Sequence, residues 1–297
     1  ITQNGPYNLP IEGVDWQSYF EKLPLTSAMD DLGSAQKYFK KIITSDFSSW
    51  SPRTGLQSIP KMDIPSLIFT GWWDHCQYGA IAFYEHLRKY GSKRQQKNTH
   101  LLVGPWHHSL KNTLNYDFGE AAAYDLTELE NRFLDKHLKE DSQHSFSQVQ
   151  VFVLGENHWR SFSDWPVPEA KSEKLFLHEN NLLSFEEPRS ENTYSSFQYD
   201  PANPVPTVGG ANNGPAIKHL PMGGGPYNQF EVCKRKDVAI FKTQPIQQKL
   251  TLIGPLEMVF FIKTSALDTD FTAKLMLVNQ DASDWMHLCD GIVRTRY

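Results

Sequence analysis

The chain has 297 residues, of which 39% are hydrophobic and 21% are charged, and its formal net charge at pH 7 is −5. This length suits two domains, and the composition is that of a folded globular protein. The negative charge offers no basic field that would attract nucleic acid or an anionic membrane surface. The longest apolar stretch, residues 253–262, is short and interrupted by Gly254 and Pro255, which argues against a membrane-spanning segment.

The cysteines argue against two further classes. Cys76, Cys233 and Cys289 lie far apart in the sequence and form no Cys-x-x-Cys motif. Three cysteines cannot all pair with one another, so neither a disulfide scaffold nor a structural zinc site is expected, although one disulfide stays open. The sequence begins at Ile1 without a signal peptide, and it leaves the cellular compartment open.

The first 60 residues indicate helices rather than strands. Residues 15–24 suit a short amphipathic helix that Pro24 ends, and residues 34–43 suit a second helix that begins at Ser34. We therefore expect a helical segment before any sheet begins.

Residues 64–138 alternate between strand-like and helix-like patterns. The apolar runs 66–70 and 100–103 predict two strands, whereas residues 78–90 and 124–138 carry apolar side chains at helical spacing. Such an alternation is typical of a parallel sheet with crossover helices. Because the crossover is right-handed, the carboxyl ends of both strands should meet at the same edge of the sheet.

From residue 145 onward the pattern becomes β-like. Strands are predicted at 149–155, 175–177, 237–243, 250–262 and 271–278, with an irregular Pro- and Gly-rich loop over 201–225. We interpret residues 145–297 as an all-β sandwich domain of jelly-roll type. The chain stops at Tyr297 without a turn signal, so we also expect that domain to be truncated.

An acid and a base follow the two predicted parallel strands. Asp74 ends the motif Gly-Trp-Trp-Asp after the first strand, and His108 ends Gly-Pro-Trp-His-His after the second. An α/β-hydrolase presents the last two members of its catalytic triad in this way, in the chain order Ser, Asp, His. No Gly-x-Ser-x-Gly occurs in the sequence, so the nucleophilic serine is expected before residue 1.

Each of these two residues has a rival interpretation. Asp74 could instead cap the helix that begins near Tyr78, because Asp is common at helix N-termini. His107 competes with its neighbour for the role of base. Ser109 is not expected to be the nucleophile, since it lies on the loop of the base and lacks a strand-to-helix elbow.

Aromatic and sulfur side chains flank the predicted pair. Trp72 and Trp73 could form the wall of an acyl pocket or could pack beneath the loops, and packing is favoured for Trp106. Cys76 could line the pocket but has no context that would make it a nucleophile. Neither His75 with His107 and His108 nor Asp268 with Asp270 has zinc-ligand spacing, so no metal is expected.

The motifs together resemble the cocaine esterase / X-Pro dipeptidyl-peptidase family of serine hydrolases, whose relatives include α-amino-acid ester hydrolases and cephalosporin acylases. The resemblance covers residues 60–297 in the family's order, and its most specific part is 200–210. It is carried by the strings at 64–65, 70–74, 103–108, 117–119, 152–160, 200–210, 268–271 and 290–297.

The resemblance implies an α/β-hydrolase domain with an inserted helical cap and a C-terminal jelly roll. Residues 1–60 would be the end of the cap, 61–142 the C-terminal part of the catalytic domain, and 145–297 a truncated jelly roll. The family pattern Gly-Pro-Trp-x-His favours His108 over His107 as the base. The nucleophile and the oxyanion-hole residue would lie upstream, so this chain alone is expected to be inactive.

The implied activity is the cleavage of esters or amides of small acyl groups through an acyl-enzyme, with β-lactam side chains or Xaa-Pro peptides among the substrates. It needs no cofactor, and it leaves room for a homo-oligomer of the full-length protein. One rival is a non-catalytic carbohydrate- or partner-binding β-sandwich. A second is a prolyl-oligopeptidase-like hydrolase, which lacks a β domain after the histidine. Apolar surface is expected to be exposed where missing strands would pair.

Overall fold

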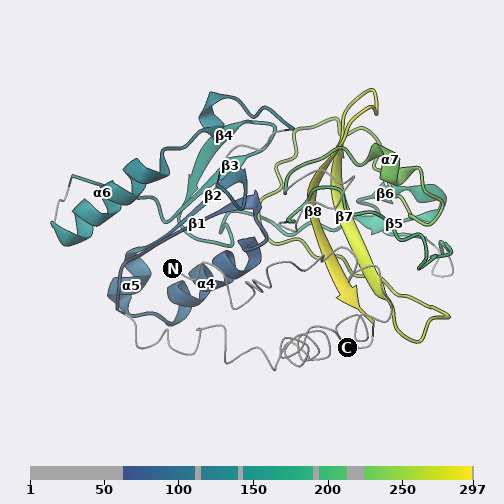
Figure 1. Cartoon of the computed structure of the whole chain (residues 1–297), viewed down its shortest axis with the longest axis horizontal. Helices are drawn as coiled ribbons and strands as arrows, with labels where there is room; N and C mark the ends of the chain where they lie inside the picture. Colours follow the sequence, from purple (N-terminus) through teal and green to yellow (C-terminus); the bar gives the residue numbers. More distant parts are fainter. Residues whose placement is uncertain (1–62, 111–114, 140–142, 190–193, 213–223, 296–297) are drawn as a thin grey trace, which may run out of the picture. The chain divides into compact units, whose positions relative to one another are not determined.

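The computed structural model describes residues 63–110, 115–139, 143–189, 194–212 and 224–295 (Figure 1). All of them belong to one compact unit, Leu56–Tyr297. The helices expected at 15–24 and 34–43, and the expected cap at 1–60, lie outside the described residues. Within the described residues, no helix combines the length and the apolar character that crossing a lipid bilayer requires.

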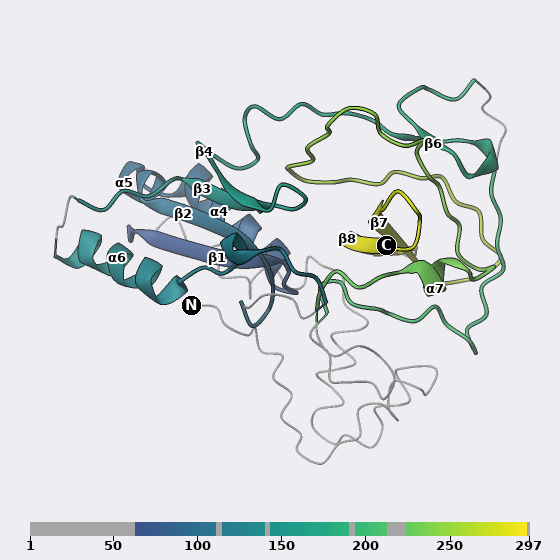
Figure 2. The ribbon, with the colours of Figure 1, turned by 90° about the horizontal axis from the view of Figure 1, so that it is seen from above.

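The first part of the described chain forms a four-stranded mixed sheet in the order β1-β2-β3-β4 (Figure 2). Strands β1 (Ser66–Trp73), β2 (Thr99–His107) and β3 (Val149–Val153) are parallel, and β4 (His158–Phe162) is antiparallel to β3. Helices α4 (Gln77–Tyr90) and α5 (Lys93–Lys97) connect β1 to β2, while η3 (Glu120–Ala122) and α6 (Leu126–Leu138) precede β3. The predicted strand-helix-strand unit is therefore confirmed.

Alternate residues of β2 face opposite layers of the core. Leu101 and Val103 pack with Tyr84 of α4 in one buried cluster. Leu102 packs with Leu129 of α6 in another cluster. The strand is thus buried on both faces, as expected for a parallel strand covered by helices, and its apolar run continues without polar alternation.

Strand β3 extends the sheet with residues that the sequence assigns to the β domain. Val149 pairs with Leu101, and Val151 pairs with Val103. Both valines are fully buried. A tight hairpin that includes Gly155 and Asn157, each at positive φ, then returns the chain as β4. Residues 149–162 therefore belong to the same sheet as β1 and β2, and the expected domain boundaries stay a prediction.

The remaining described chain contains two antiparallel pairs. Strands β5 (Phe176–Leu177) and β6 (Leu183–Ser184) flank η4 (Glu179–Asn181), and the long hairpin β7 (Asp270–Val278) and β8 (Trp285–Arg294) is drawn in yellow in Figure 1. A one-turn helix, α7 (Phe230–Cys233), lies between them in the sequence. A mixed sheet with helices followed by antiparallel strands fits an α/β-hydrolase portion with a β domain.

Two of the predicted strands are absent from the described structure. Residues 237–243 make only an isolated bridge, from Lys242 to Leu182, and residues 250–262 form no strand. In the second segment Pro255 cannot donate a backbone hydrogen bond and Gly254 adopts a φ of 133°. The prediction of strands in these two segments is wrong. A strand forms only where a neighbouring strand accepts and donates its backbone hydrogen bonds, and an apolar composition does not provide that neighbour.

One buried cluster joins the carboxyl end of β1 to the hairpin β7–β8. Trp73 stacks on Phe118 at a ring distance of 5.7 Å, and both belong to a cluster with Phe152 and Met286. The indole nitrogen Nε1 of Trp73 donates a hydrogen bond to the backbone oxygen of His287 at 3.2 Å. The residue immediately before Asp74 is thereby held by both parts of the described chain.

Candidate active site

The strand register places the predicted acid and base side by side. Trp73, the last residue of β1, pairs with His107, the last residue of β2. Asp74 and His108 each follow by one residue at the same edge of the sheet. Between the pairs Gly71–Gly104 and Trp73–His107, β2 contains one more residue than β1. This bulge includes Pro105, which lacks the N–H that regular pairing would use, and it redirects the end of β2.

Two glycines accommodate a buried tryptophan at this bulge. A Cβ atom on Gly71 would lie 2.1 Å from the backbone oxygen of Trp106, and one on Gly104 would lie 2.4 Å from its ring. The ring of Trp106 is 1% exposed, and its Nε1 donates to the backbone oxygen of Ala122 at 3.0 Å. Trp106 therefore packs beneath the loops, as expected, and fixes the chain two residues before His108.

The carboxylate of Asp74 is buried and accepts three hydrogen bonds. Oδ2 accepts from Thr70 Oγ1 at 3.0 Å, and Oδ1 accepts from the backbone N–H of Cys76 at 2.9 Å. The third donor is Nδ1 of His108, at 2.8 Å from Oδ1. These partners compensate the loss of hydration of a residue that is only 5% exposed. They also fix the direction in which the carboxylate faces.

The imidazole of His108 is oriented by that bond. When Nδ1 donates to a carboxylate, the neutral ring carries its lone pair on Nε2. The side chain is 31% exposed, so the ring retains access to the surroundings of the loop. A buried carboxylate, an oriented ring and a free lone pair together form an acid–base unit that can accept a proton at Nε2.

The structure does not make Asp74 the cap of α4, because the N-cap residue is Cys76 and no side chain caps the helix. The carboxylate of Asp74 accepts instead from the N–H of Cys76 and closes the turn that precedes the helix. The same oxygen accepts from His108. The two functions are compatible because a carboxylate oxygen has two lone pairs. The catalytic role of the pair stays a prediction.

Two further histidines lie beside the pair. The rings of His75 and His108 are 4.2 Å apart at their centroids. Burial, followed by the charge that His108 would carry, lowers the pKa of His75. Burial and His108 likewise lower the pKa of His107. The Asp74 carboxylate opposes both shifts, and a neutral imidazole is the favoured form of these two neighbours near neutral pH.

His107 lacks the support that His108 has. Its ring nitrogens lie 3.2–3.3 Å from Oγ of Ser109, which is exposed on the same loop. No acid is found hydrogen-bonded to His107 among the residues that the structure describes. Since a serine on the loop of its own base has no strained elbow, this contact gives no reason to prefer the pair His107–Ser109.

The three residues expected to line a pocket differ in how deeply they are buried. Trp73 is 1% exposed and belongs to the buried cluster, so its indole packs in this structure. Trp72 is half-buried, and its Nε1 donates to the backbone oxygen of Phe152 at 2.8 Å. Cys76 is half-buried in the turn beside the acid. Contact of these three with a substrate stays a prediction.

The thiol of Cys76 is held in its protonated form. Burial, and then the charge of Asp74, raise the pKa of this thiol. Because the thiolate is the nucleophilic form, both effects lower its reactivity. The environment of Cys76 is therefore consistent with the expectation that it is not a nucleophile.

The structure brings together a set of side chains that sequence spacing does not. One potential ligand atom each from Asp74, His75, Cys76 and His108 lie within 4.8 Å of one another. The sequence suggested a different trio, with His107 in place of Asp74 and Cys76. Thr70, which lies in β1 four residues before Asp74, was also not predicted as a partner of the carboxylate.

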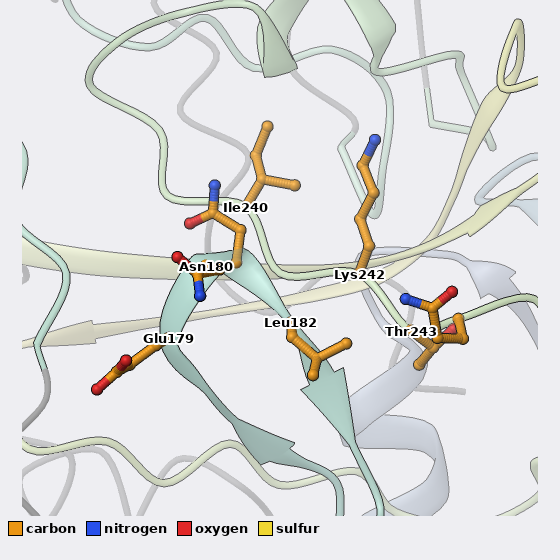
Figure 3. Close-up of a pocket in the computed structure, with 8 residues that line it drawn as sticks. Glu179, Asn180, Leu182, Ile240, Lys242 and Thr243 are labelled. Carbon is orange, nitrogen blue, oxygen red and sulfur yellow. The ribbon is translucent and has the colours of Figure 1, made fainter.

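A separate cavity of ≈ 670 Å³ contains none of the predicted site residues (Figure 3). Its wall combines amide, hydroxyl and apolar side chains with one carboxylate and one ammonium group. The lining residues are Glu179, Asn180, Asn181, Leu182, Ile240, Lys242, Thr243 and Gln244. The wall contains no histidine or cysteine, so it offers no counterpart of the acid–base pair.

Two family models match the sequence of this chain. Residues 19–110 match the family model of the X-Pro dipeptidyl-peptidase (S15 family), and residues 144–297 match that of the X-Pro dipeptidyl-peptidase C-terminal non-catalytic domain. Cocaine esterase from Rhodococcus sp. (strain MB1 Bresler) is 33% identical over 270 residues, which are 84% of this chain and 44% of that protein.

A solved structure shows the same fold. The crystal structure of an aminopeptidase from the marine sediment archaeon Thaumarchaeota archaeon matches with a TM-score of 0.76 and 22% identity, over 95% of this chain and 49% of that one. The chain thus spans less than half the length of these two proteins. With family models that match both parts of its sequence, the chain belongs to the cocaine esterase / X-Pro dipeptidyl-peptidase family.

Proposed function

We propose that Asp74 and His108 are the acid and the base of a serine hydrolase that cleaves ester or amide bonds through an acyl-enzyme. The observation that carries this proposal is the 2.8 Å hydrogen bond between His108 Nδ1 and the buried Asp74 carboxylate. The proposal places the nucleophilic serine and the oxyanion hole outside residues 1–297, because the sequence contains no Gly-x-Ser-x-Gly.

In this mechanism Nε2 of His108 takes the proton of the serine hydroxyl while the serine oxygen attacks the carbonyl carbon. The imidazolium then returns the proton to the leaving alcohol or amine as the bond to it breaks. A water molecule repeats the sequence on the acyl-enzyme and releases the acid and the free serine. Asp74 keeps Nδ1 as the donor and stabilises the imidazolium, and Thr70 and the N–H of Cys76 hold the carboxylate in place.

The substrates proposed are esters or amides of small acyl groups, including β-lactam side chains and Xaa-Pro peptides. The name of the 33% identical relative favours an ester among these. The half-buried Trp72 and Cys76 and the buried Trp73 are the proposed substrate contacts beside the pair. The mechanism needs no cofactor.

The β-rich part of the chain is proposed to be a jelly roll. The antiparallel pairs β5–β6 and β7–β8 support this, as does the match of residues 144–297 to the family's C-terminal domain. A carbohydrate- or partner-binding sandwich is the competing function for this part. The hydrogen-bonded Asp74 and His108 favour the hydrolase, because a binding module has no use for an oriented, partly exposed base.

The test compares two adjacent histidines in a protein that carries this chain together with the serine-bearing segment. We expect His108→Gln to lower the turnover of p-nitrophenyl esters by several orders of magnitude and to abolish labelling by a fluorophosphonate. The matched variant His107→Gln should retain both. Equal activity in the His108 variant and the wild type would refute the assignment, and loss of activity in the His107 variant alone would move the base to the neighbouring residue.

A further inference from the structure

We propose that Asp74, His75, Cys76 and His108 form a binding site for a thiophilic divalent cation such as Zn²⁺, and that the bound cation blocks the acid–base pair. The first three residues form the turn between β1 and α4, and the fourth is on the loop after β2. The blocking effect rests on the proposed function, whereas the binding itself does not.

The positions of the donors suit a tetrahedral ion. One ligand atom from each side chain lies within 4.8 Å of all the others. Zinc binds nitrogen and oxygen ligands at about 2.0–2.2 Å and sulfur at about 2.3 Å, so ligand atoms around it are roughly 3.3–3.8 Å apart. His75 Nδ1 is already 3.6 Å from Asp74 Oδ1. The widest distance between two ligand atoms, 4.8 Å, would have to shorten by about 1 Å to complete the tetrahedral coordination shell. Side-chain rotation can supply a movement of this size.

The donor types select the cation. Two imidazoles, one thiol and one carboxylate combine soft and borderline ligands, which favour Zn²⁺, Co²⁺ and Cu²⁺. Mg²⁺ and Ca²⁺ prefer shells made of oxygen and would find one carboxylate here. The cation takes the place of the hydrogen bond between His108 Nδ1 and Asp74 Oδ1. The Cys76 thiol releases its proton to solvent and binds as the thiolate, and the neutral ring of His108 then carries its proton on Nε2.

The surroundings of the site already orient one ligand. Asp74 is held by Thr70 Oγ1 and by the backbone N–H of Cys76, and neither donor would be lost when a metal binds to the carboxylate. Hydrogen bonds of this kind orient metal ligands and raise their affinity for the ion. A cation bound to Nδ1 of His108 and to Asp74 leaves the ring proton on Nε2, so Nε2 has no lone pair with which to accept a proton.

Binding is tested on the full chain without any assay of activity. We expect Zn²⁺ to bind with a one-to-one stoichiometry in calorimetric titration, and Co²⁺ to give a thiolate charge-transfer band. His75→Gln and Cys76→Ser should each weaken binding by about 10- to 100-fold or more, and the serine variant should lose the band. The matched controls, His86→Gln in α4 and Cys289→Ser in β8, should bind as the wild type does.

Equal affinity in the ligand variants and the wild type would overturn the site, and so would a Co²⁺ complex without the thiolate band. Blocking is tested in the serine-bearing protein, where saturating Zn²⁺ should abolish ester hydrolysis until a chelator is added. Cys76→Ser should shift the inhibiting concentration upward by the same factor as the affinity. Hydrolysis that continues at saturation overturns the blocking effect, whereas binding without any hydrolase activity overturns only the proposed function.

Discussion

The free energy of unfolding should depend on pH because His100 is buried in β2, the strand that precedes His108. His100 lies in β2, is 4% exposed, and its Nδ1 is 2.9 Å from the backbone oxygen of Ser147. Its Nε2 has no hydrogen-bond partner among the described residues. Burial lowers the pKa of His100 from 6.5 to about 4, with smaller contributions from the positive charges of Lys136 and Arg88.

The sign of the effect follows from this lowered pKa. Between about pH 6.5 and about pH 4 the unfolded chain binds a proton at this position and the folded chain does not, so acid favours unfolding. The stabilisation is complete above the unfolded pKa and is lost as the pH falls toward the folded one. For these two pKa values, the free energy of unfolding should fall by about 2 kcal/mol between about pH 7.5 and about pH 5 because of His100 alone.

The assay is urea unfolding of the full chain at both pH values, followed by circular dichroism. In His100→Gln, whose amide can donate to the oxygen of Ser147 and does not titrate in this range, the loss between the two pH values should be smaller by that amount. The matched variant His86→Gln should retain the loss seen in the wild type. An identical pH dependence in His100→Gln and the wild type would refute the reasoning.

Three further outcomes are expected. Gly71→Ala should destabilise the chain by about 1–3 kcal/mol because its Cβ would overlap Trp106. Gly79→Ala in α4, whose Cβ would meet nothing within 4 Å, should stabilise the chain by about 0.5–1 kcal/mol. Shifts of the urea midpoint in the same direction for both variants would contradict this. In the serine-bearing protein, Asp74→Asn should lower kcat by about 10⁴-fold at unchanged fold, because the amide favours the wrong tautomer of His108; wild-type turnover in that variant would exclude Asp74 as the orienting acid. The full chain by itself should give no burst with p-nitrophenyl esters, and stoichiometric release of p-nitrophenol would contradict this.

The sequence carried enough information to predict the pairing of Asp74 and His108. Both follow short apolar runs joined by a helical segment, and the handedness of such a unit determines which strand ends meet. The contacts of Cys76 and Thr70 with the same carboxylate were beyond the sequence. These contacts depend on the conformation of the turn between β1 and α4. The hydrophobic periodicity of the sequence predicts helices and strands but not the conformation of a single turn.

The β-rich part was predicted less well, for a different physical reason. Residues 271–278 became a strand because residues 285–294 pair with them along their whole length. Residues 250–262 have a similar apolar composition but no partner strand among the described residues. A strand is stabilised by its neighbour, so composition alone cannot distinguish the two segments.

The hydrogen bonds between β2 and β3 affect how this chain can be divided. One family model ends at residue 110 and the other begins at residue 144. Val149 and Val151, which belong to the second match, pair with Leu101 and Val103 in the first. A cut at residue 144 would separate β1 and β2 from β3 and β4. The first piece would lose β3, the buried neighbour of β2, and the second piece would begin with β3 as an unpaired, valine-rich edge strand. Recombination between relatives should therefore keep all four strands from one parent when the crossover follows Phe162, the last residue of β4.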